Sequence, residues 1–164
     1  MPDAYLILDL ERQGTPRGPV IKRGLEGSIF LLSVDHSLIS PRDAASGAAT
    51  GKIKSLPVII TKDIDATTPM LYQALTTNER IKRAEIKFFG PHQSGYRSGM
   101  ETNIYNMILE SVFISQVEFS HSNPPAGGGT NNMIEKISLV FEKIEWEWTE
   151  GNFVTQFSNS RSPI

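Results

Sequence analysis

The chain has 164 residues, about the length of one domain. Its 16 Lys and Arg residues against 18 Asp and Glu residues give a net charge of −2, which argues against nucleic-acid binding, where a basic surplus is expected. Cysteine is absent, which excludes disulfides, Cys-ligated zinc and a catalytic thiol. No apolar run approaches the ~20 residues of a membrane-spanning helix, and the first residues do not resemble a signal peptide. We therefore expect synthesis in the cytoplasm and no membrane insertion.

Alternating apolar residues predict strands in the N-terminal third of the chain. The first strand has one apolar face made by three leucines, Leu6, Leu8 and Leu10. Two more strands are predicted over residues 28–39 and 53–64, and Pro57 indicates that the third lies at a sheet edge. Between them, residues 41–52 form a loop of small residues without periodicity. A connection of about 12 residues is long for a compact domain, and such loops are often functional.

One helix is predicted, followed only by strands. Thr68 can cap the helix, Pro69 suits its first position, and an apolar stripe follows at helical spacing, formed by Met70, Leu71, Ala74 and Leu75. Strands are then predicted over residues 81–89, 101–121 and 133–149. In the last, apolar residues change from odd to even positions, which predicts a bulge or sharp bend near Glu142 and Lys143.

The order of these elements predicts a mainly β, antiparallel domain over residues 1–150, because no helices alternate with strands. Bends of the predicted kind are typical of a closed or two-sheet barrel. Residues 151–164 are polar and rich in Ser and Asn, and we expect a short, partly ordered tail.

Catalytic and metal-binding patterns are weak. Glu145 and Glu147 have a spacing that a glycosidase pair could use, but they fit the solvated face of a strand better. The histidines lack metal-ligand spacing, Asp63 and Asp65 lack the rest of a calcium loop, and Ser98 is not in a nucleophile elbow. A basic cluster fits a solvated or salt-bridged strand face, and comprises Arg80, Lys82, Arg83 and Lys87. We therefore predict no enzyme activity, cofactor or metal.

The strand over residues 101–121 is apolar on both faces, whereas an antiparallel sheet commonly has one wet face. Its even positions are candidate contacts with a neighbouring subunit: Ile104, Ile108, Val112 and Ile114. An ordinary closed core is the alternative explanation of the same pattern.

Several segments in order resemble the haemolysin-coregulated protein (Hcp) family, the tube subunits of type VI secretion systems. They are residues 4–9 (AYLILD), 33–41 (SVDHSLISP), 58–65 (VIITKDID) with 68–71 (TPML), 81–86 (IKRAEI) and 143–146 (KIEW). The resemblance implies a two-sheet antiparallel β-barrel with one short flanking α-helix. It also implies a non-catalytic homohexamer whose rings stack into a secreted tube.

The partners implied by this resemblance are a VgrG-like spike protein, a contractile sheath and small effector proteins held in the lumen. In this interpretation the long loop contacts the next ring, through residues near its two ends: Pro41, Arg42, Asp43, Gly51 and Lys52. Two alternatives are a tube protein of a contractile phage tail and a carbohydrate-binding β module. The latter needs exposed aromatic residues, whereas Trp146 and Trp148 have the alternation of buried ones. A hydrolase on a β scaffold is a further alternative, and it lacks a convincing nucleophile.

Overall fold

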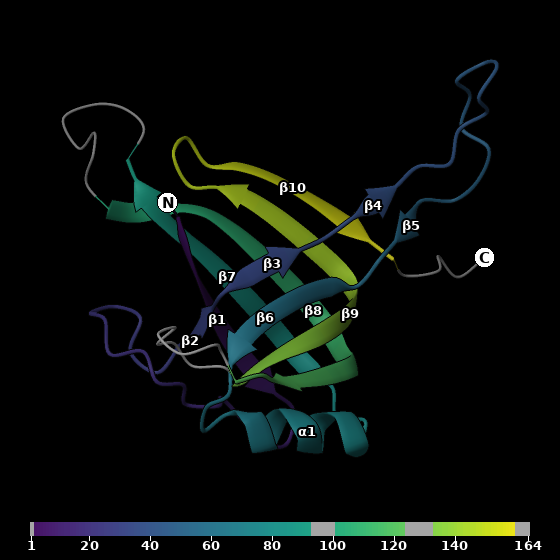
Figure 1. The fold of residues 1–164 in the computed structure, drawn as a ribbon. Helices are drawn as coiled ribbons and strands as arrows, with labels where there is room; N and C mark the ends of the chain where they lie inside the picture. The colour runs from purple at the N-terminus through teal and green to yellow at the C-terminus, as the bar shows by residue number, and fades with distance from the viewer. Residues whose placement is uncertain (1, 93–100, 124–132, 160–164) are drawn as a thin grey trace.

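The computed structural model describes residues 2–92, 101–123 and 133–159 (Figure 1). These residues form antiparallel strands and one helix. In chain order they are β1 (Asp3–Leu10), β2 (Ile29–Leu31), β3 (Ser33–Asp35), β4 (Leu38–Ile39), β5 (Lys54–Ser55), β6 (Val58–Asp63), α1 (Thr68–Thr76), β7 (Ile81–Pro91), β8 (Glu101–His121), β9 (Met133–Trp148) and β10 (Phe153–Ser158). Within the described residues, no helix is long and apolar enough to cross a membrane.

The main sheet curls into a nearly closed barrel (Figure 1). Its strand order is β2-β1-β7-β8-β9-β6-β3, with β10 also paired to β9. The two outer strands, β2 and β3, are consecutive in the chain and are joined through Leu32, whose N–H donates to the carbonyl of Thr61 at 2.7 Å. The ends of the sheet therefore meet, which confirms the predicted antiparallel barrel. β4 and β5 form a small separate sheet.

Core residues come from every long strand, and the predicted apolar faces are confirmed in β1. Leu6, Leu8 and Leu10 are buried, and they pack in one cluster with residues of β7, β8 and β9. The helix lies across one end of the barrel (Figure 1) and contributes Leu71 and Ala74 to the same cluster. The short helix is thus held by packing, as its length requires.

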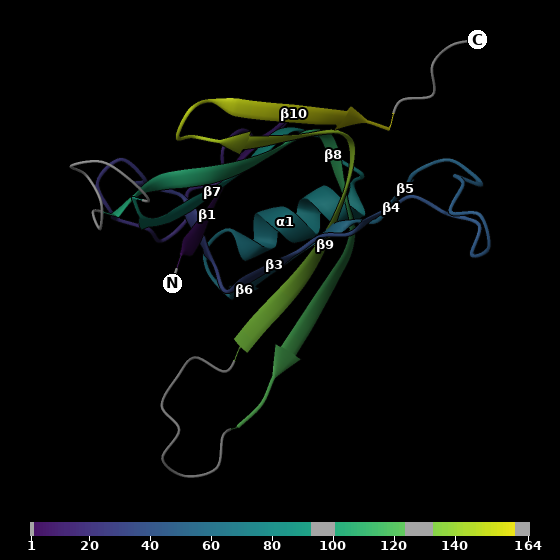
Figure 2. The same cartoon turned by 90° about the horizontal axis from the view of Figure 1, so that it is seen from above.

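β8 and β9 form one long hairpin that bends in its middle (Figure 2). Glu110 pairs with Lys143 and Val112 pairs with Phe141, so Ser111 lies opposite Glu142. Ser111 has φ 54°, a left-handed conformation that turns the strand. This is the bend predicted near Glu142, and it exchanges the inward and outward positions of both strands.

Two other strand predictions are corrected. The predicted strand over residues 28–39 is divided into β2, β3 and β4, because the chain leaves β1 at Leu32 and joins β6. Pro57 does not mark an edge strand: it lies in the break between β5 and β6, and β6 runs between β9 and β3.

The helix begins as predicted, with a correction at its cap. Thr67 holds the N-cap position, and Thr68 is the first helical residue. The Thr68 hydroxyl accepts from the N–H of Asp65 at 3.1 Å and donates to Glu135 Oε1 at 3.0 Å. It therefore ties the start of the helix to β9 rather than capping the helix.

The segment after Gly151 adds a strand rather than a tail. β10 pairs with the second half of β9, from Phe153 opposite Trp148 to Ser158 opposite Lys143. Phe157 packs against the core. The first half of β9 pairs with β6 instead, so the barrel divides into its two half-sheets at the bend.

Candidate assembly surfaces

The predicted functional loop is an arm that projects from the barrel (Figures 1 and 2). We define the arm as β4, β5 and residues 40–53 between them. Rather than being irregular, the arm is a hairpin: Arg42 and Ala49 form an isolated bridge, and the Thr50 N–H donates to the Pro41 carbonyl at 2.9 Å. The predicted contact residues all lie in it, and all are exposed except Pro41, which is half-buried: Pro41, Arg42, Asp43, Gly51 and Lys52.

Asp43 shapes the tip of the arm. Its carboxylate accepts from the Ala45 N–H at 2.9 Å and from the Ser46 hydroxyl at 3.0 Å. These hydrogen bonds, first that from Ala45, lower the pKa of Asp43. Gly47 closes the turn with φ 71°, where its N–H donates to the Asp43 carbonyl at 2.8 Å. The tip is therefore a turn held by its own hydrogen bonds. The sequence pattern of this segment did not indicate a hairpin.

The root of the arm is fixed by His36, which follows β3. Its ring stacks on Trp146 at 6.4 Å between centroids and meets the edge of Phe141 at 5.6 Å. Burial lowers the pKa of His36. The Nε2 atom is shielded from solvent and has no hydrogen-bond partner among the described residues. His36 is therefore a side chain packed against two aromatic residues of β9.

The four candidate interface residues of β8 fall into two groups. Val112 and Ile114 are buried in the core of this subunit, so they are not open to a neighbour. The bend at Ser111 explains why the two groups differ. Before the bend the odd-numbered residues of β8 face the core, and directly after it the even-numbered residues do. Ile104 and Ile108 lie before the bend on the opposite side of the strand from Met107 and Leu109, which are core residues. Of these two, Ile104 is half-buried and remains a candidate for a subunit contact, whereas Ile108 is buried.

Ile108 is already nearly covered within the subunit. It lies between Glu85 of β7 and Glu145 of β9 in the strand register, and it is buried. Much of the apparent surplus of apolar residues in β8 therefore comes from the exchange of faces at the bend. The hypothesis of a wholly apolar second face is thus corrected in part.

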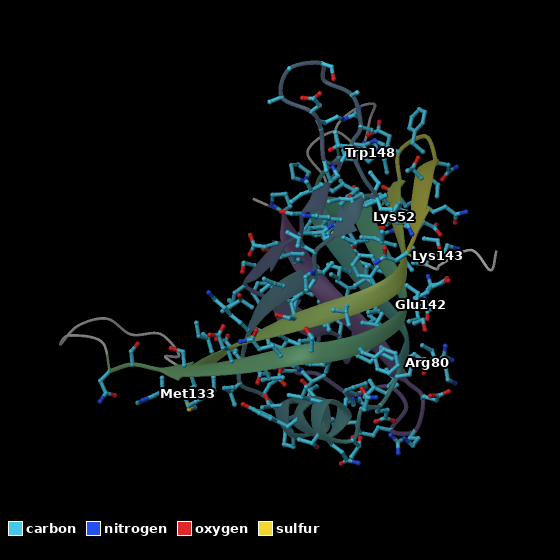
Figure 3. All side chains as sticks on the ribbon, turned by 90° about the vertical axis from the view of Figure 1, so that its right-hand side faces the viewer. Lys52, Arg80, Met133, Glu142, Lys143 and Trp148 are labelled. Atoms are coloured by element: carbon cyan, nitrogen blue, oxygen red, sulfur yellow. The ribbon has the colours of Figure 1, made fainter. Side chains whose placement is uncertain are left out.

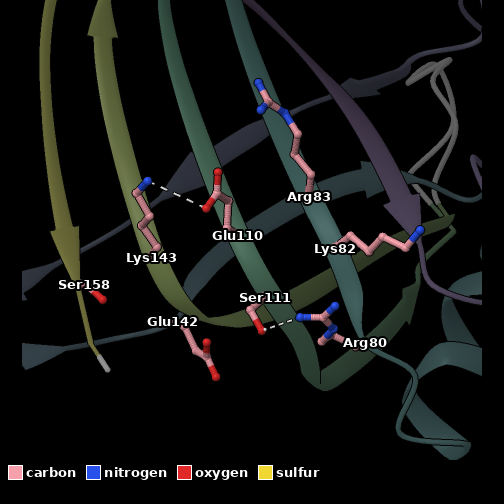
Figure 4. A pocket seen from close by; sticks show the side chains of 8 residues that line it. All are labelled: Arg80, Lys82, Arg83, Glu110, Ser111, Glu142, Lys143 and Ser158. Atoms are coloured by element: carbon pink, nitrogen blue, oxygen red, sulfur yellow. Dashed lines mark hydrogen bonds and ion pairs between the residues drawn. The ribbon is translucent and has the colours of Figure 1, made fainter. Parts of the chain in front are cut away.

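The basic cluster lines a shallow cleft at the bend (Figure 4). The cleft has a volume of about 440 Å³ and also takes residues from β8, β9 and β10, so that its lining is Arg80, Lys82, Arg83, Glu110, Ser111, Glu142, Lys143 and Ser158. Lys143 Nζ lies 3.8 Å from Glu110 Oε2, and Arg80 Nη1 donates to Ser111 Oγ at 3.3 Å. Lys87 does not line this cleft. Two members of the cluster form ion pairs, Arg80 with Glu11 at 3.6 Å and Arg83 with Glu85 at 3.7 Å, which agrees in part with the predicted salt-bridged face.

The sequence analysis also weighed several other residues for metal binding, carbohydrate binding or catalysis. Asp65 accepts from the Thr67 N–H at 2.8 Å and lies 3.2 Å from Lys62 Nζ, so it orders the turn before the helix. Trp146 packs against the core, whereas Trp148 is partly exposed, contrary to the prediction. Ser98 lies outside the described residues. Among those that are described, no group of three or more His, Asp or Glu side chains could hold a metal ion.

Comparison with known proteins identifies the fold and the family. The family model described as "Type VI secretion system effector, Hcp" matches residues 8–148. The chain is 29% identical over 130 residues to the "Major exported protein" of Pseudomonas aeruginosa, covering 79% of this chain and 73% of that protein.

Solved structures agree with this match. A mutant of the Hcp1 protein from E. coli EAEC 042 superposes with a TM-score of 0.82 at 30% identity, covering 96% of this chain and 99% of that one. A structure described as an Hcp protein, with a TM-score of 0.87 at 23% identity over 99% of this chain and 100% of that one, supports the fold alone. The family is one of exported, non-catalytic structural proteins. The chain belongs to the Hcp family, the tube proteins of type VI secretion systems.

Proposed function

We propose that the protein forms hexameric rings, that the rings stack into a hollow tube, and that the tube carries small effector proteins in its lumen. A contractile sheath drives the tube out of the cell together with a VgrG-like spike protein. Membership of the tube protein family supports this role. The observation within the structure that carries the stacking step is the arm.

The arm has the properties of a surface made for a partner. Its two strands pair only with each other among the described residues, and residues 42–54 are exposed. A two-stranded hairpin is marginally stable alone in water, so contact with another subunit would stabilise it. The unpaired edges of β4 and β5 also offer backbone donors and acceptors to a neighbouring strand.

The arm reaches beyond the barrel, so it can contact another ring without disturbing the core (Figure 1). Ring stacking must be weaker than ring closure, because tubes have to assemble and then be lost. A small polar surface fits this requirement, since the arm tip is made of Asp43, Ser46, Gly47 and small residues. The root of the arm, by contrast, exposes the apolar side chains of Leu38, Ile39 and Ile53.

Deletion of residues 43–50 tests the role of the arm. We expect the variant to keep its hexameric rings, seen by negative-stain electron microscopy, and to lose stacked tubes. Loss of the rings would contradict the separation of ring closure from stacking. Tubes of normal length would show that the arm does not join rings.

A charge-reversal pair gives a milder test with a matched control. The variant Arg42→Glu/Lys52→Glu changes two exposed side chains of the arm without removing any core residue. We expect shorter or fewer tubes from it. Arg23→Glu, an exposed change in the loop before β2, should leave tube length unchanged. Equal effects of the two variants would indicate a general effect of charge and would contradict a specific arm contact.

A further inference from the structure

The arm joins the barrel at an interruption between two pairs of strands. β3 pairs with β6 as far as Asp35, and β4 pairs with β5 from Leu38 onward. We call the residues between these pairs, 36–37 on one strand and 56–57 on the other, the hinge. The arm points away from the end of the barrel that α1 covers (Figures 1 and 3). A movement at the hinge would therefore displace the arm and leave the barrel unchanged.

The backbone holds the hinge weakly. Among the described residues, one backbone hydrogen bond joins its two sides, from the Leu56 N–H to the Ser37 carbonyl at 3.2 Å. Pro57 has no N–H, so it cannot donate a second bond between the two strands. The direction of the arm therefore depends on a side-chain contact as well as on the backbone.

His36 supplies that contact. Its ring lies against Trp146 and Phe141 of β9, in the stacked and edge-on arrangements described above. Phe141 is buried and Trp146 packs against the core, so the support is a fixed part of the barrel. The other hinge residues that could make such a contact, Ser37 and Leu56, are exposed. We call the contact of His36 with the two aromatic residues the latch.

The latch suits an uncharged imidazole. The Nε2 atom of His36 is shielded from solvent and has no hydrogen-bond partner among the described residues. A protonated ring carries an N–H donor on both nitrogens, and a buried charged donor without an acceptor is costly. Attraction of the cation to the aromatic faces offsets part of this cost, but it provides no acceptor for Nε2. Burial accordingly lowers the pKa of His36.

The charged residues around the latch do not supply the missing acceptor. Those of β9 near Trp146 lie at the bend or alternate with it and so face the other side of the strand: Glu142, Lys143, Glu145 and Glu147. Asp35 and Lys54, the charged residues of the strands next to the hinge, are exposed. β6 begins beside the hinge with Val58, Ile59 and Ile60. Solvent is therefore where a charged His36 ring would find its partners.

We propose that protonation of His36 opens the latch and releases the arm. The uncharged ring holds the hinge against β9, whereas the charged ring leaves Phe141 and Trp146 for water, and the arm then turns about the hinge. This inference rests on the proposed role of the arm in stacking, and it adds a regulation of that step. Tubes persist at neutral pH and separate into rings in weak acid. A return to neutral pH closes the latch again, since the only change is the gain and loss of a proton.

The difference in proton affinity between the two states sets the pH range of the release. In the released arm the His36 ring is in water and takes up a proton near the ordinary pKa of 6.5, whereas the latched ring does so only at lower pH. The proton therefore binds the released state more tightly, as any ligand that shifts such an equilibrium must. Between these two values, each unit of pH raises the ratio of released to latched arms by up to about tenfold.

A spin label on the arm tests the release without requiring tubes. The chain has no cysteine, so Ala44→Cys, at an exposed position of the arm, carries a single nitroxide. Electron paramagnetic resonance of the unstacked protein is recorded from about pH 8 to about pH 5, the range in which histidine titrates. We expect the label to become more mobile as the pH falls and to recover on neutralisation. Asp43 does not disturb the measurement, because its lowered pKa keeps it ionised over this range.

Substitutions of His36 assign the change to this residue. His36→Phe keeps an aromatic ring against Trp146 without a site for a proton, so the label should stay immobile over the whole range. His36→Arg places a permanent charge at the hinge, so the label should be mobile already at neutral pH. His121→Phe, the same change at an exposed histidine at the end of β8, should keep the dependence of the parent. A parent-like dependence in His36→Phe would overturn the proposal.

Circular dichroism and electron microscopy of the same samples separate the possible outcomes. Label mobility that is constant in a folded protein would overturn the latch, whether or not tubes form. A loss of circular dichroism over the same interval would show general unfolding and would also overturn it. Parent tubes that break into rings at about pH 5, while His36→Phe tubes persist, would support the full proposal. A mobile label in acid with no tubes at any pH would support the latch and contradict the proposed tube function alone.

Discussion

Lys62 and Glu135 form an ion pair inside the barrel, with 2.5 Å between Nζ and Oε1 and both side chains fully buried. They are direct neighbours across β6 and β9. Lys62 Nζ also donates to the Asp63 carbonyl at 2.9 Å and lies 3.2 Å from Asp65 Oδ1. Together with the Thr68 hydroxyl, this pair joins two strands to the start of the helix.

Removal of one partner of this pair should strongly destabilise the protein. We expect Lys62→Met to lower the free energy of unfolding by about 3–5 kcal/mol, because Glu135 is left as a buried charge without its cation. The double variant Lys62→Met/Glu135→Leu should recover most of that loss, because no buried charge remains. Urea unfolding of the two variants checks this. Equal losses in both would show that packing, not charge, dominates at this site.

Glu79 gives the fold a dependence on acid pH. Its buried carboxylate accepts from the backbone N–H groups of Arg12 at 2.6 Å and Gln13 at 2.8 Å, and from the Gln13 side chain at 2.7 Å. Burial is the largest influence and raises the pKa, but the hydrogen bonds, led by those from Gln13, together outweigh it and lower the pKa of Glu79. The carboxylate therefore stabilises the fold above the ordinary glutamate pKa, and this contribution is lost as the pH falls through the lowered value.

The variant Glu79→Gln isolates this effect. At neutral pH it should be less stable than the parent by an amount on the order of 1 kcal/mol, since hydrogen bonds to a charged group are replaced by neutral ones. Well below the ordinary glutamate pKa the two proteins should approach the same stability. Urea unfolding over a pH series measures the difference. A constant difference at all pH values would contradict the assigned role of the carboxylate.

The sequence pattern predicted the parts of the fold that depend on local periodicity. Apolar spacing predicted the leucine face of β1, the helix and the bend near Glu142. Pro69 indicated where the helix begins. The position of Ser111 was not, because a left-handed serine within a strand carries no local signal. For this reason the alternation alone places Val112 and Ile114 among the candidate subunit contacts, whereas both are core residues.

Long-range contacts account for the remaining differences between sequence and structure. Lys62 and Glu135 are 73 residues apart in the sequence. Residue type alone predicts an exposed side chain at each of the two positions. The arm has small residues and side-chain hydrogen bonds around Asp43 in place of apolar alternation.

His36 should make stability depend on pH in the weakly acidic range. Burial lowers its pKa from the ordinary value of 6.5, so the unfolded chain takes up a proton at this site before the folded protein does. Stability from the neutral ring is complete above that value and is lost as the pH falls from it towards the lowered pKa. His36→Leu should remove this part of the pH dependence while keeping an apolar contact with Trp146.

Thermal unfolding of both proteins above and below the ordinary histidine pKa checks this expectation. The parent should lose stability over that interval, and His36→Leu should lose less. His121→Leu is the matched control, because it replaces an exposed histidine at the end of β8 by the same residue. The same slope in parent and His36→Leu would show that other groups produce it.

Ser111 should tolerate glycine better than a β-branched residue, because its φ of 54° is unfavourable for side chains. A left-handed conformation costs a non-glycine residue about 1–2 kcal/mol, and glycine avoids that cost while losing about 0.5–1 kcal/mol through its flexibility. We therefore expect Ser111→Gly to unfold at the same or slightly higher urea concentration and Ser111→Val at a clearly lower one. Ser120, an exposed residue further along the same strand, lacks a positive φ and is the matched control. There the order should reverse, with glycine less stable than valine, since β-branched residues favour strands. If both positions rank the two residues alike, the bend in β8 does not depend on the backbone of Ser111.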